Sequence, residues 1–159
     1  QAVAMIQGPH IAHLFAKGDM QKLQQMMTRS AQAILLFAVP VVIVIVLFGK
    51  FIIRTVYGPA FETAYVPLVI LCVGQLVNAS MGSVASLLNM TGHERDTTKS
   101  VFVGAIVNVV LNLSLVPVWG MTGAAVATST TLIVWNLIMW HKARLRTGIE
   151  TSPLFRRRR

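Results

Sequence analysis

The chain has 159 residues, of which 55% are hydrophobic and only 12% are charged. A soluble globular domain has about 25% charged residues, so this composition excludes an ordinary soluble domain and indicates an integral membrane protein. The net charge of +9 would suggest nucleic acid as a partner only if the basic residues formed one patch. The placement of these residues therefore decides between a nucleic-acid-binding protein and a membrane protein with basic loops.

The first 19 residues do not have the pattern of a signal peptide. The stretch QAVAMIQGPHIAHLFAKGD lacks a basic region followed by an apolar core and a small-residue cleavage site. Because the chain starts with Gln1 instead of Met, we expect this stretch to be the end of a membrane helix and the chain to be a fragment. Asp19 is a residue type that caps the start of a following helix.

Four later segments are long and apolar enough to cross a bilayer, which takes about 20 residues. We expect them at about residues 30–49, 64–90, 98–116 and 121–140. The second is long enough to tilt, and Pro67 near its start favours a kink. The sequence therefore predicts an all-α protein, a polytopic transmembrane helix bundle in which residues 1–146 form the membrane domain and residues 147–159 form a basic, disordered cytoplasmic tail.

The last two predicted spans are separated by the sequence PVWG at residues 117–120. The 41 residues from Ser100 to Trp140 contain no Asp, Glu, Lys, Arg or His, and such a run is too long for one crossing. Pro117 and Gly120 interrupt it, and tryptophan is typical of the membrane interface. We therefore expect a tight turn at the membrane surface with antiparallel spans on its two sides.

Basic residues are divided unequally between the two sides of these spans. One side carries 12 of the 14, namely Lys17, Lys22, Arg29, Arg95, Lys99, Lys142, Arg144, Arg146 and Arg156 to Arg159. The other side has only Lys50 and Arg54. The positive-inside rule places the larger set and the C-terminus in the cytoplasm. Because these residues are spread over membrane-proximal loops, nucleic acid is not expected as a partner; Arg54, Arg95 and Lys99 are candidate basic residues at the membrane interface.

Small and polar residues recur every four positions in three of the predicted spans, for example Gly74, Asn78 and Gly82, or Gly104, Asn108 and Asn112. Positions i and i+4 share one face of a helix. For any single asparagine, helix packing is favoured over the lining of a substrate path, and the two interpretations do not exclude each other. The candidates for substrate path or packing are Gln75, Asn78, Asn108, Asn112 and Asn136.

The sequence contains no pattern that indicates an enzyme, a cofactor or a metal site. No predicted span has an ionisable residue in its interior, so these spans offer no proton relay. The four histidines, His10, His13, His93 and His141, lack the spacing of a metal-binding motif, and no glycine-rich phosphate loop is present. We therefore expect neither catalysis nor a bound cofactor or metal.

Three stretches resemble the C-terminal part of the polysaccharide flippase family, the O-antigen and exopolysaccharide exporters within the multidrug/oligosaccharidyl-lipid/polysaccharide exporter superfamily. IIRTVYGPAFETAYVPLVIL at 52–71 is similar to an outer-loop pattern of that family, and LLNMTGHERD at 87–96 is similar to a cytoplasmic-loop pattern. NVVLNLSLVPVWGMTGAAVATSTT at 108–131 is similar to its most specific pattern. The resemblance covers about residues 9–149.

The resemblance implies a larger, two-lobed transporter of which this chain supplies the C-terminal lobe. It implies alternating access that flips undecaprenyl-diphosphate-linked oligosaccharide across the bacterial inner membrane for lipopolysaccharide O-antigen or related glycans. The implied partners are the lipid-linked oligosaccharide, membrane lipids and the missing N-terminal lobe. The spans lack a cation for the diphosphate, so the other lobe, or Arg54 and the basic residues at the mouths, would supply it.

Other functions stay open from the sequence alone. A cation-coupled multidrug exporter of the same superfamily would need ionisable residues in the spans of the other lobe. A non-transporting membrane subunit of a polysaccharide-synthesis complex would need no second lobe. A membrane-embedded glycosyltransferase or polymerase would need catalytic carboxylates, and the predicted outer loops contain only Glu62.

Overall fold

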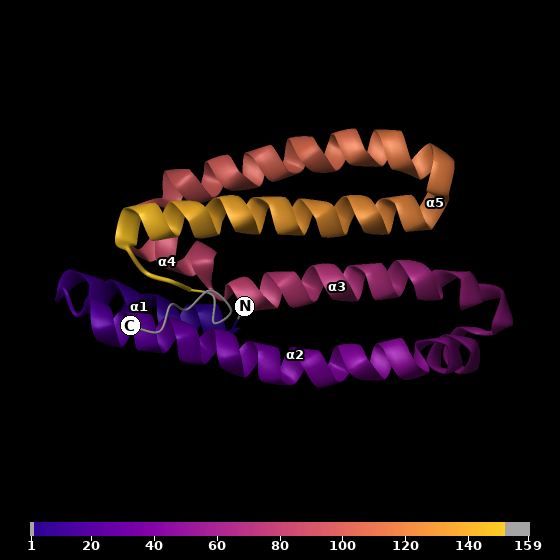
Figure 1. Ribbon diagram of the computed structural model, residues 1–159, viewed down its shortest axis with the longest axis horizontal. Helices are drawn as coiled ribbons and strands as arrows, with labels where there is room; N and C mark the ends of the chain where they lie inside the picture. The colour runs from indigo at the N-terminus through magenta and orange to yellow at the C-terminus, as the bar shows by residue number, and fades with distance from the viewer. Residues whose placement is uncertain (1, 152–159) are drawn as a thin grey trace.

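The computed structural model describes residues 2–151, and within them it contains helices and no strand (Figure 1). The elements are α1 (Ala2–Ala16), α2 (Met20–Tyr57), the 3-10 helix η1 (Pro59–Ala64), α3 (Tyr65–Met81), α4 (Val84–Met90) and α5 (Glu94–Thr147). Three segments are long and apolar enough to cross a membrane: α2, η1 together with α3, and α5. The prediction of an all-α, polytopic membrane protein is confirmed.

α5 is a helical hairpin of 54 residues. Its backbone leaves helical geometry at Gly120, which has φ 53° and ψ −128°, and in Figure 1 the ribbon of α5 doubles back on itself. A positive φ is readily adopted by glycine, which has no Cβ. The two arms, residues 94–119 and 121–147, are antiparallel as predicted. However, Pro117 stays within the helix, so the reversal takes place at Gly120 and not over the whole of PVWG.

α2 extends beyond the predicted span 30–49 at both ends. Its start is capped as predicted, because an Asp19 carboxylate oxygen accepts a hydrogen bond from the Lys22 backbone N–H at 3.1 Å. The first turns of α2 bury Leu23 and Met27 against other helices. Hydropathy alone did not reveal these turns, because their opposite face is polar.

The predicted span 64–90 is divided into two helices, and the interruption is not the kink expected near Pro67. The chain breaks between α3 and α4 at Gly82, which has φ 68°. A Cβ at Gly82 would lie 3.0 Å from the Cβ of Ala31 and 3.1 Å from the carbonyl oxygen of Thr151, so the break also permits a close approach of two distant segments. Pro67 lies in the first turn of α3, where its missing N–H removes no helix hydrogen bond.

The helices form an elongated bundle with two different ends (Figure 1). We call one the turn end; it contains residues 50–64 and the bend of α5 at residues 117–123. We call the other the basic end; it contains the α1–α2 junction, α4 and both termini of α5. Of the described basic residues, only Lys50 and Arg54 belong to the turn end. The arrangement thus places the two groups of basic residues at opposite ends of the bundle.

The hydrophobic core lies at the basic end. Its buried members are Ile11, Leu23, Met27, Met81, Val84, Leu87, Leu88, Met139, Ala143 and Ile149. By contrast, large apolar side chains along the rest of α2 are exposed, including Leu36, Phe37 and Leu47. Such surface suits contact with lipid or with other parts of a larger membrane protein.

The residues that follow α5 do not form the free tail predicted for 147–159, as far as the structure describes them. Gly148 ends α5 in the left-handed conformation, and its N–H donates to the Arg144 carbonyl at 3.0 Å. Ile149 is only 2% exposed and Thr151 is fully buried. Apolar burial and backbone hydrogen bonds therefore hold this segment against α2. Residues 152–159, with the four terminal arginines, lie outside the described residues.

Candidate functional site

Three of the five predicted polar residues form a chain of amides between α3 and the second arm of α5. The Asn136 side-chain amide donates to Oδ1 of Asn78 at 3.0 Å and to the Leu132 carbonyl at 2.8 Å. Asn78 in turn donates to Oε1 of Gln75 at 3.2 Å. Asn136 is 4% exposed, whereas Gln75 is exposed. The chain of amides therefore runs from a buried helix interface to the surface of α3.

The other two predicted residues join the two arms of α5. Asn112 donates to Oδ1 of Asn108 at 3.1 Å and to its carbonyl at 2.8 Å. Asn108 donates to Oγ1 of Thr131 at 3.2 Å, and Thr131 donates to the Ala127 carbonyl at 2.8 Å. The five predicted residues thus form two separate hydrogen-bonded groups instead of one site.

The second arm of α5 is packed on two faces. A Cβ at Gly123 would lie 2.6 Å from the carbonyl carbon of Leu115 in the first arm, and a Cβ at Gly74 of α3 would lie 2.7 Å from Oγ of Ser129. Ser129 also donates to the Ile70 carbonyl at 2.9 Å. Small residues allow these close backbone approaches, and the hydroxyl bonds across the helices.

Sequence reasoning missed Ser129 and Thr131 as members of these contacts. The available signal was the run GAAVATSTT at 123–131, in which every residue except Val126 is Gly, Ala, Ser or Thr. A helix that is small on all sides packs closely against more than one neighbour. The one-in-four spacing selected Asn136 on this helix but neither Ser129 nor Thr131.

The predicted interface residues have different surroundings. Arg54 at the turn end pairs with Glu62 at 3.5 Å, and both side chains are substantially exposed. Arg95 and Lys99 are exposed near the start of α5, and the described residues provide neither of them with an ion pair. All three positions are thus open to solvent or headgroups, and their role at a membrane interface stays a prediction.

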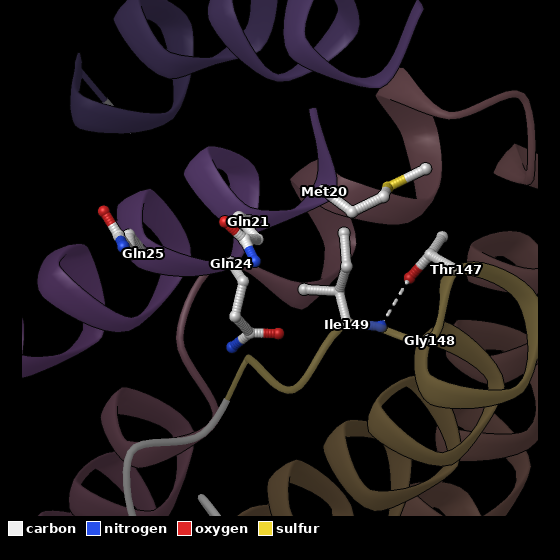
Figure 2. Close-up of a pocket in the computed structure, with 7 residues that line it drawn as sticks. All are labelled: Met20, Gln21, Gln24, Gln25, Thr147, Gly148 and Ile149. Carbon is white, nitrogen blue, oxygen red and sulfur yellow. Dashed lines mark hydrogen bonds between the residues drawn. The ribbon is translucent and has the colours of Figure 1, made fainter. Parts of the chain in front are cut away.

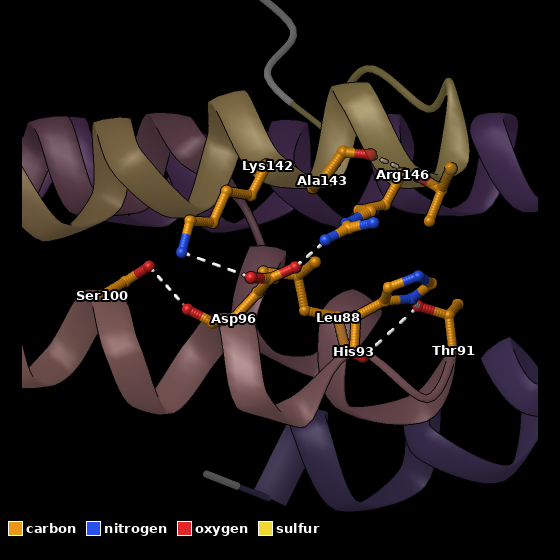
Figure 3. A network of polar contacts seen from close by, with 9 residues as sticks. Leu88, Thr91, His93, Asp96, Ser100, Lys142, Ala143 and Arg146 are labelled. Atoms are coloured by element: carbon orange, nitrogen blue, oxygen red, sulfur yellow. Dashed lines mark hydrogen bonds and ion pairs between the residues drawn. The ribbon is translucent and has the colours of Figure 1, made fainter.

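An ion cluster at the basic end was not predicted (Figure 3). Asp96 is of a residue type that caps helices, but the cap position of α5 is His93, which makes no side-chain capping bond. Asp96 instead faces the second arm, where its carboxylate lies 3.3 Å from Nζ of Lys142 and 3.2 Å from Nε of Arg146. The cluster therefore joins the two ends of the hairpin.

The protonation of Asp96 reflects this cluster. Partial desolvation raises the pKa of the Asp96 carboxyl, but hydrogen bonds and charge interactions with Lys142 and Arg146 outweigh it, so the pKa is below its usual value of 3.8. Asp96 is therefore ionised at neutral pH. The cluster contains no metal-binding set, and no group of three His, Cys, Asp or Glu occurs anywhere in residues 2–151.

Two adjoining cavities lie at the basic end, away from the five predicted residues. The larger, of about 470 Å³, is lined by Met20, Gln21, Gln24, Gln25, Thr147, Gly148 and Ile149 (Figure 2). The smaller, of about 200 Å³, is lined by Gln24, Gln25, Thr28, Arg29 and Gln32. Glutamine amides from the first turns of α2 therefore dominate the lining.

The relatives of this chain include proteins named as flippases. It is 27% identical over 144 residues to the probable low-salt glycan biosynthesis flippase Agl15 of Haloferax volcanii, covering 89% of this chain and 30% of the relative. It is 28% identical over 148 residues to the probable flippase AglR of the same organism, covering 91% and 30%. An uncharacterized membrane protein of Methanocaldococcus jannaschii is 26% identical over 145 residues, covering 91% and 29%.

No family model and no solved structure matches the chain. The chain spans about 30% of the length of the curated relatives it matches. Two of these relatives are named as probable flippases, and both matches cover about nine tenths of the chain. The comparisons therefore confirm the resemblance to the polysaccharide flippase family.

Proposed function

We propose that this chain, a relative of the polysaccharide flippases, forms part of a transporter that flips lipid-linked oligosaccharide across a membrane. The observation that carries the proposal is the match to two probable flippases over about nine tenths of the chain. The helical hairpin and the apolar segments supply the membrane-embedded body that such transport needs. In this proposal the protein moves its substrate without changing it, so the chain has no catalytic residues.

In the proposed topology, the basic end faces the cytoplasm. Membrane proteins concentrate Lys and Arg on the cytoplasmic side, and the two groups of basic residues lie at opposite ends of the bundle. The C-terminus is then cytoplasmic, and the turn end, with η1 and Gly120, faces outward. A bacterial inner membrane is the finer form of this proposal, although the relatives named above are archaeal.

The proposed substrate has a glycan head on a lipid carrier. One relative is named for glycan biosynthesis, which supports a glycan without specifying its sugars or carrier. An O-antigen unit on undecaprenyl-diphosphate is the specific form implied by the family resemblance. Because the chain covers less than one third of its relatives, we propose that another lobe completes the substrate path and contributes cations for the diphosphate.

The two amide groups have a mechanical role in this proposal. Alternating access moves packed bundles of helices around a central site. Hydrogen bonds through Asn136 and Asn108 fasten α3 and the two arms of α5 into one unit that moves as a body. Gln75 lies at the exposed edge of that unit, where its Oε1 accepts from Asn78 and its side-chain N–H groups face the substrate path in this proposal.

The proposal is tested by complementation. The full-length gene product is expressed in a host that lacks its own glycan flippase, and surface glycan is measured together with the amount of inserted protein. Restored surface glycan is the expected result. Absence of glycan despite correct insertion, repeated in a host that makes the glycan of the source organism, would contradict the proposal and favour a multidrug exporter or a non-transporting subunit.

A further inference from the structure

The two cavities at the basic end form a continuous surface, which we call the amide groove: Gln21, Gln24, Gln25, Thr28, Arg29 and Gln32. The cavities share Gln24 and Gln25, so they adjoin along the first turns of α2. Gln21, Gln25 and Gln32 recur at spacings of four and seven residues, which places them on one face of the helix. The larger cavity falls within the range of about 300–1,000 Å³ that small-ligand sites occupy.

One wall of the amide groove is held in place by the segment that follows α5. The Gln24 side-chain amide donates to the Glu150 carbonyl, and its Oε1 accepts from the Glu150 backbone N–H at 2.7 Å. The Glu150 carboxylate accepts from the Trp140 indole at 2.7 Å and lies 3.6 Å from Nε of Arg144. Figure 2 shows Gln24 directed at this segment. The wall formed by residues 147–149 is thus fixed to α2.

Other polar groups in the amide groove are available to a ligand. Gln21, Gln25, Arg29 and Gln32 are exposed, and the described part of the chain contains no hydrogen-bond partner for their side chains. Each glutamine amide provides two donors and one acceptor oxygen. Among the described residues, no carboxylate lines either cavity, so their lining provides no negative charge to attract a metal or organic cation.

The chemistry of the lining selects a class of ligand. Vicinal hydroxyls of a sugar both donate and accept hydrogen bonds, which matches a row of amides. The apolar C–H face of a sugar ring matches Met20, which lines the larger cavity and is 39% exposed. Arg29, in the smaller cavity, is the one charged residue among the described lining residues, and its guanidinium pairs well with phosphate oxygens.

We propose that the amide groove binds the glycan head of the lipid-linked oligosaccharide at the cytoplasmic side before the head is flipped, with Arg29 directed toward the phosphate. This inference rests on the flippase function proposed above and assigns it a loading site. The site is distinct from the two amide groups, which lie between α3 and the arms of α5 and whose members bond within each group.

The test uses the full-length protein in membranes of the source organism or of a host that makes its glycan. The photoreactive residue p-benzoylphenylalanine is placed at Gln21 or Gln25, and in a control protein at Asn89. Asn89 is also an exposed amide near the basic end but lines neither cavity. After irradiation, the adducts are identified by mass spectrometry. We expect glycan-bearing adducts at positions 21 and 25 and none at 89.

A second arm measures export by variants of the same protein. Gln21→Ala combined with Gln25→Ala should lower surface glycan several-fold at equal protein level, whereas Asn89→Ala should leave it unchanged. Adducts only with another segment of the protein, or absence of glycan adducts with export unchanged in the double variant, would overturn the groove assignment and leave the flippase function intact. Failure of the unsubstituted protein to restore export would instead overturn the flippase function.

Discussion

The two ends of the bundle are stabilised in different ways. At the basic end, leucine and methionine side chains are fully buried, and Asp96 and Glu150 each join two helical segments or their ends. At the turn end, the polar contacts of the described residues are few, such as Arg54 with Glu62 and Lys50 over the Tyr65 ring at 5.5 Å. The basic end is therefore stabilised by contacts within this chain. The exposed apolar side chains of the turn end and of the outer part of α2 need contacts with lipid or with other parts of the protein.

This difference between the two ends indicates which parts of the bundle can move relative to their surroundings. A transporter that alternates between two states needs a rigid unit and a surface that is not fixed to it. Under the proposed function, the second arm of α5 with α3 is that rigid unit, held together by small residues and amides. The exposed apolar face of α2 near Leu36 and Phe37 supplies a surface with no fixed partner in the described residues.

The largest expected effect comes from a cavity in the core of the basic end. Leu87→Ala removes a fully buried side chain and should destabilise the protein by about 2–5 kcal/mol. Leu113→Ala is the matched control, because Leu113 is 74% exposed in the first arm of α5. Thermal unfolding of the full-length protein in lipid nanodiscs measures both. Equal loss in the two variants would contradict the contrast between the ends.

The second effect concerns the contact between the arms of α5. Gly123→Ala places a Cβ 2.6 Å from the backbone carbonyl carbon of Leu115, which cannot move without shifting the helix. Overpacking of this kind costs about 1–3 kcal/mol. Thr122→Ala serves as the control, because this substitution at the neighbouring position adds no atom to the contact between the arms. A lower midpoint of unfolding for the glycine variant alone is the expected result, and wild-type behaviour would show that the arms lie farther apart.

The third effect is smaller and concerns the amide chain. Asn136→Ala leaves Asn78 without its interhelical donor. Hydrogen bonds between membrane helices contribute about 0.6 kcal/mol on average and up to about 1.7 kcal/mol. A double-mutant cycle with Asn78→Ala isolates the interaction between the two side chains. The coupling free energy obtained from thermal unfolding should favour the folded state. A coupling of zero would mean that the two residues act independently.

The smallest effect is a pH dependence at the basic end. The folded-state pKa of Asp96 is lowered, so its stabilisation is present above its unfolded value near 3.8 and is lost as the pH falls below that value. Exposed ion pairs contribute at most about 1 kcal/mol. The Asp96→Asn variant should therefore have a slightly lower unfolding temperature than wild type at pH 7. The difference between the two unfolding temperatures should disappear below about pH 4. A difference in unfolding temperature that grows as the pH falls would contradict the stabilising ion pairs of Asp96.

The sequence predicted those features of the fold that depend on local apolar runs and glycine. The apolar run 100–140 and Gly120 were sufficient to predict the antiparallel hairpin. The break at Gly82 was not predictable, because it accommodates the Thr151 carbonyl from a segment 69 positions away. Likewise, the partners of Asp96 depend on the register of the hairpin, and the docking of residues 148–151 depends on Gln24.

The candidate site was predicted in part for the same reason. The spacing of Asn78, Asn108 and Asn112 identified residues on packed helix faces. It did not reveal which of them bond to each other, since that depends on how α3 and the arms of α5 are placed. The amide groove was missed because it forms only where residues 147–149 lie against the first turns of α2, and no local pattern predicts that contact.

The most direct test of the account is lipid translocation by the purified full-length protein in liposomes that contain its lipid-linked oligosaccharide. A glycosidase or lectin added outside reports how much of the glycan reaches the outer leaflet. The account predicts that nearly all of the glycan becomes accessible over time and that protein-free liposomes expose only the outer-leaflet share. Accessibility that stays at this share, with folded and correctly inserted protein, would contradict the central claim.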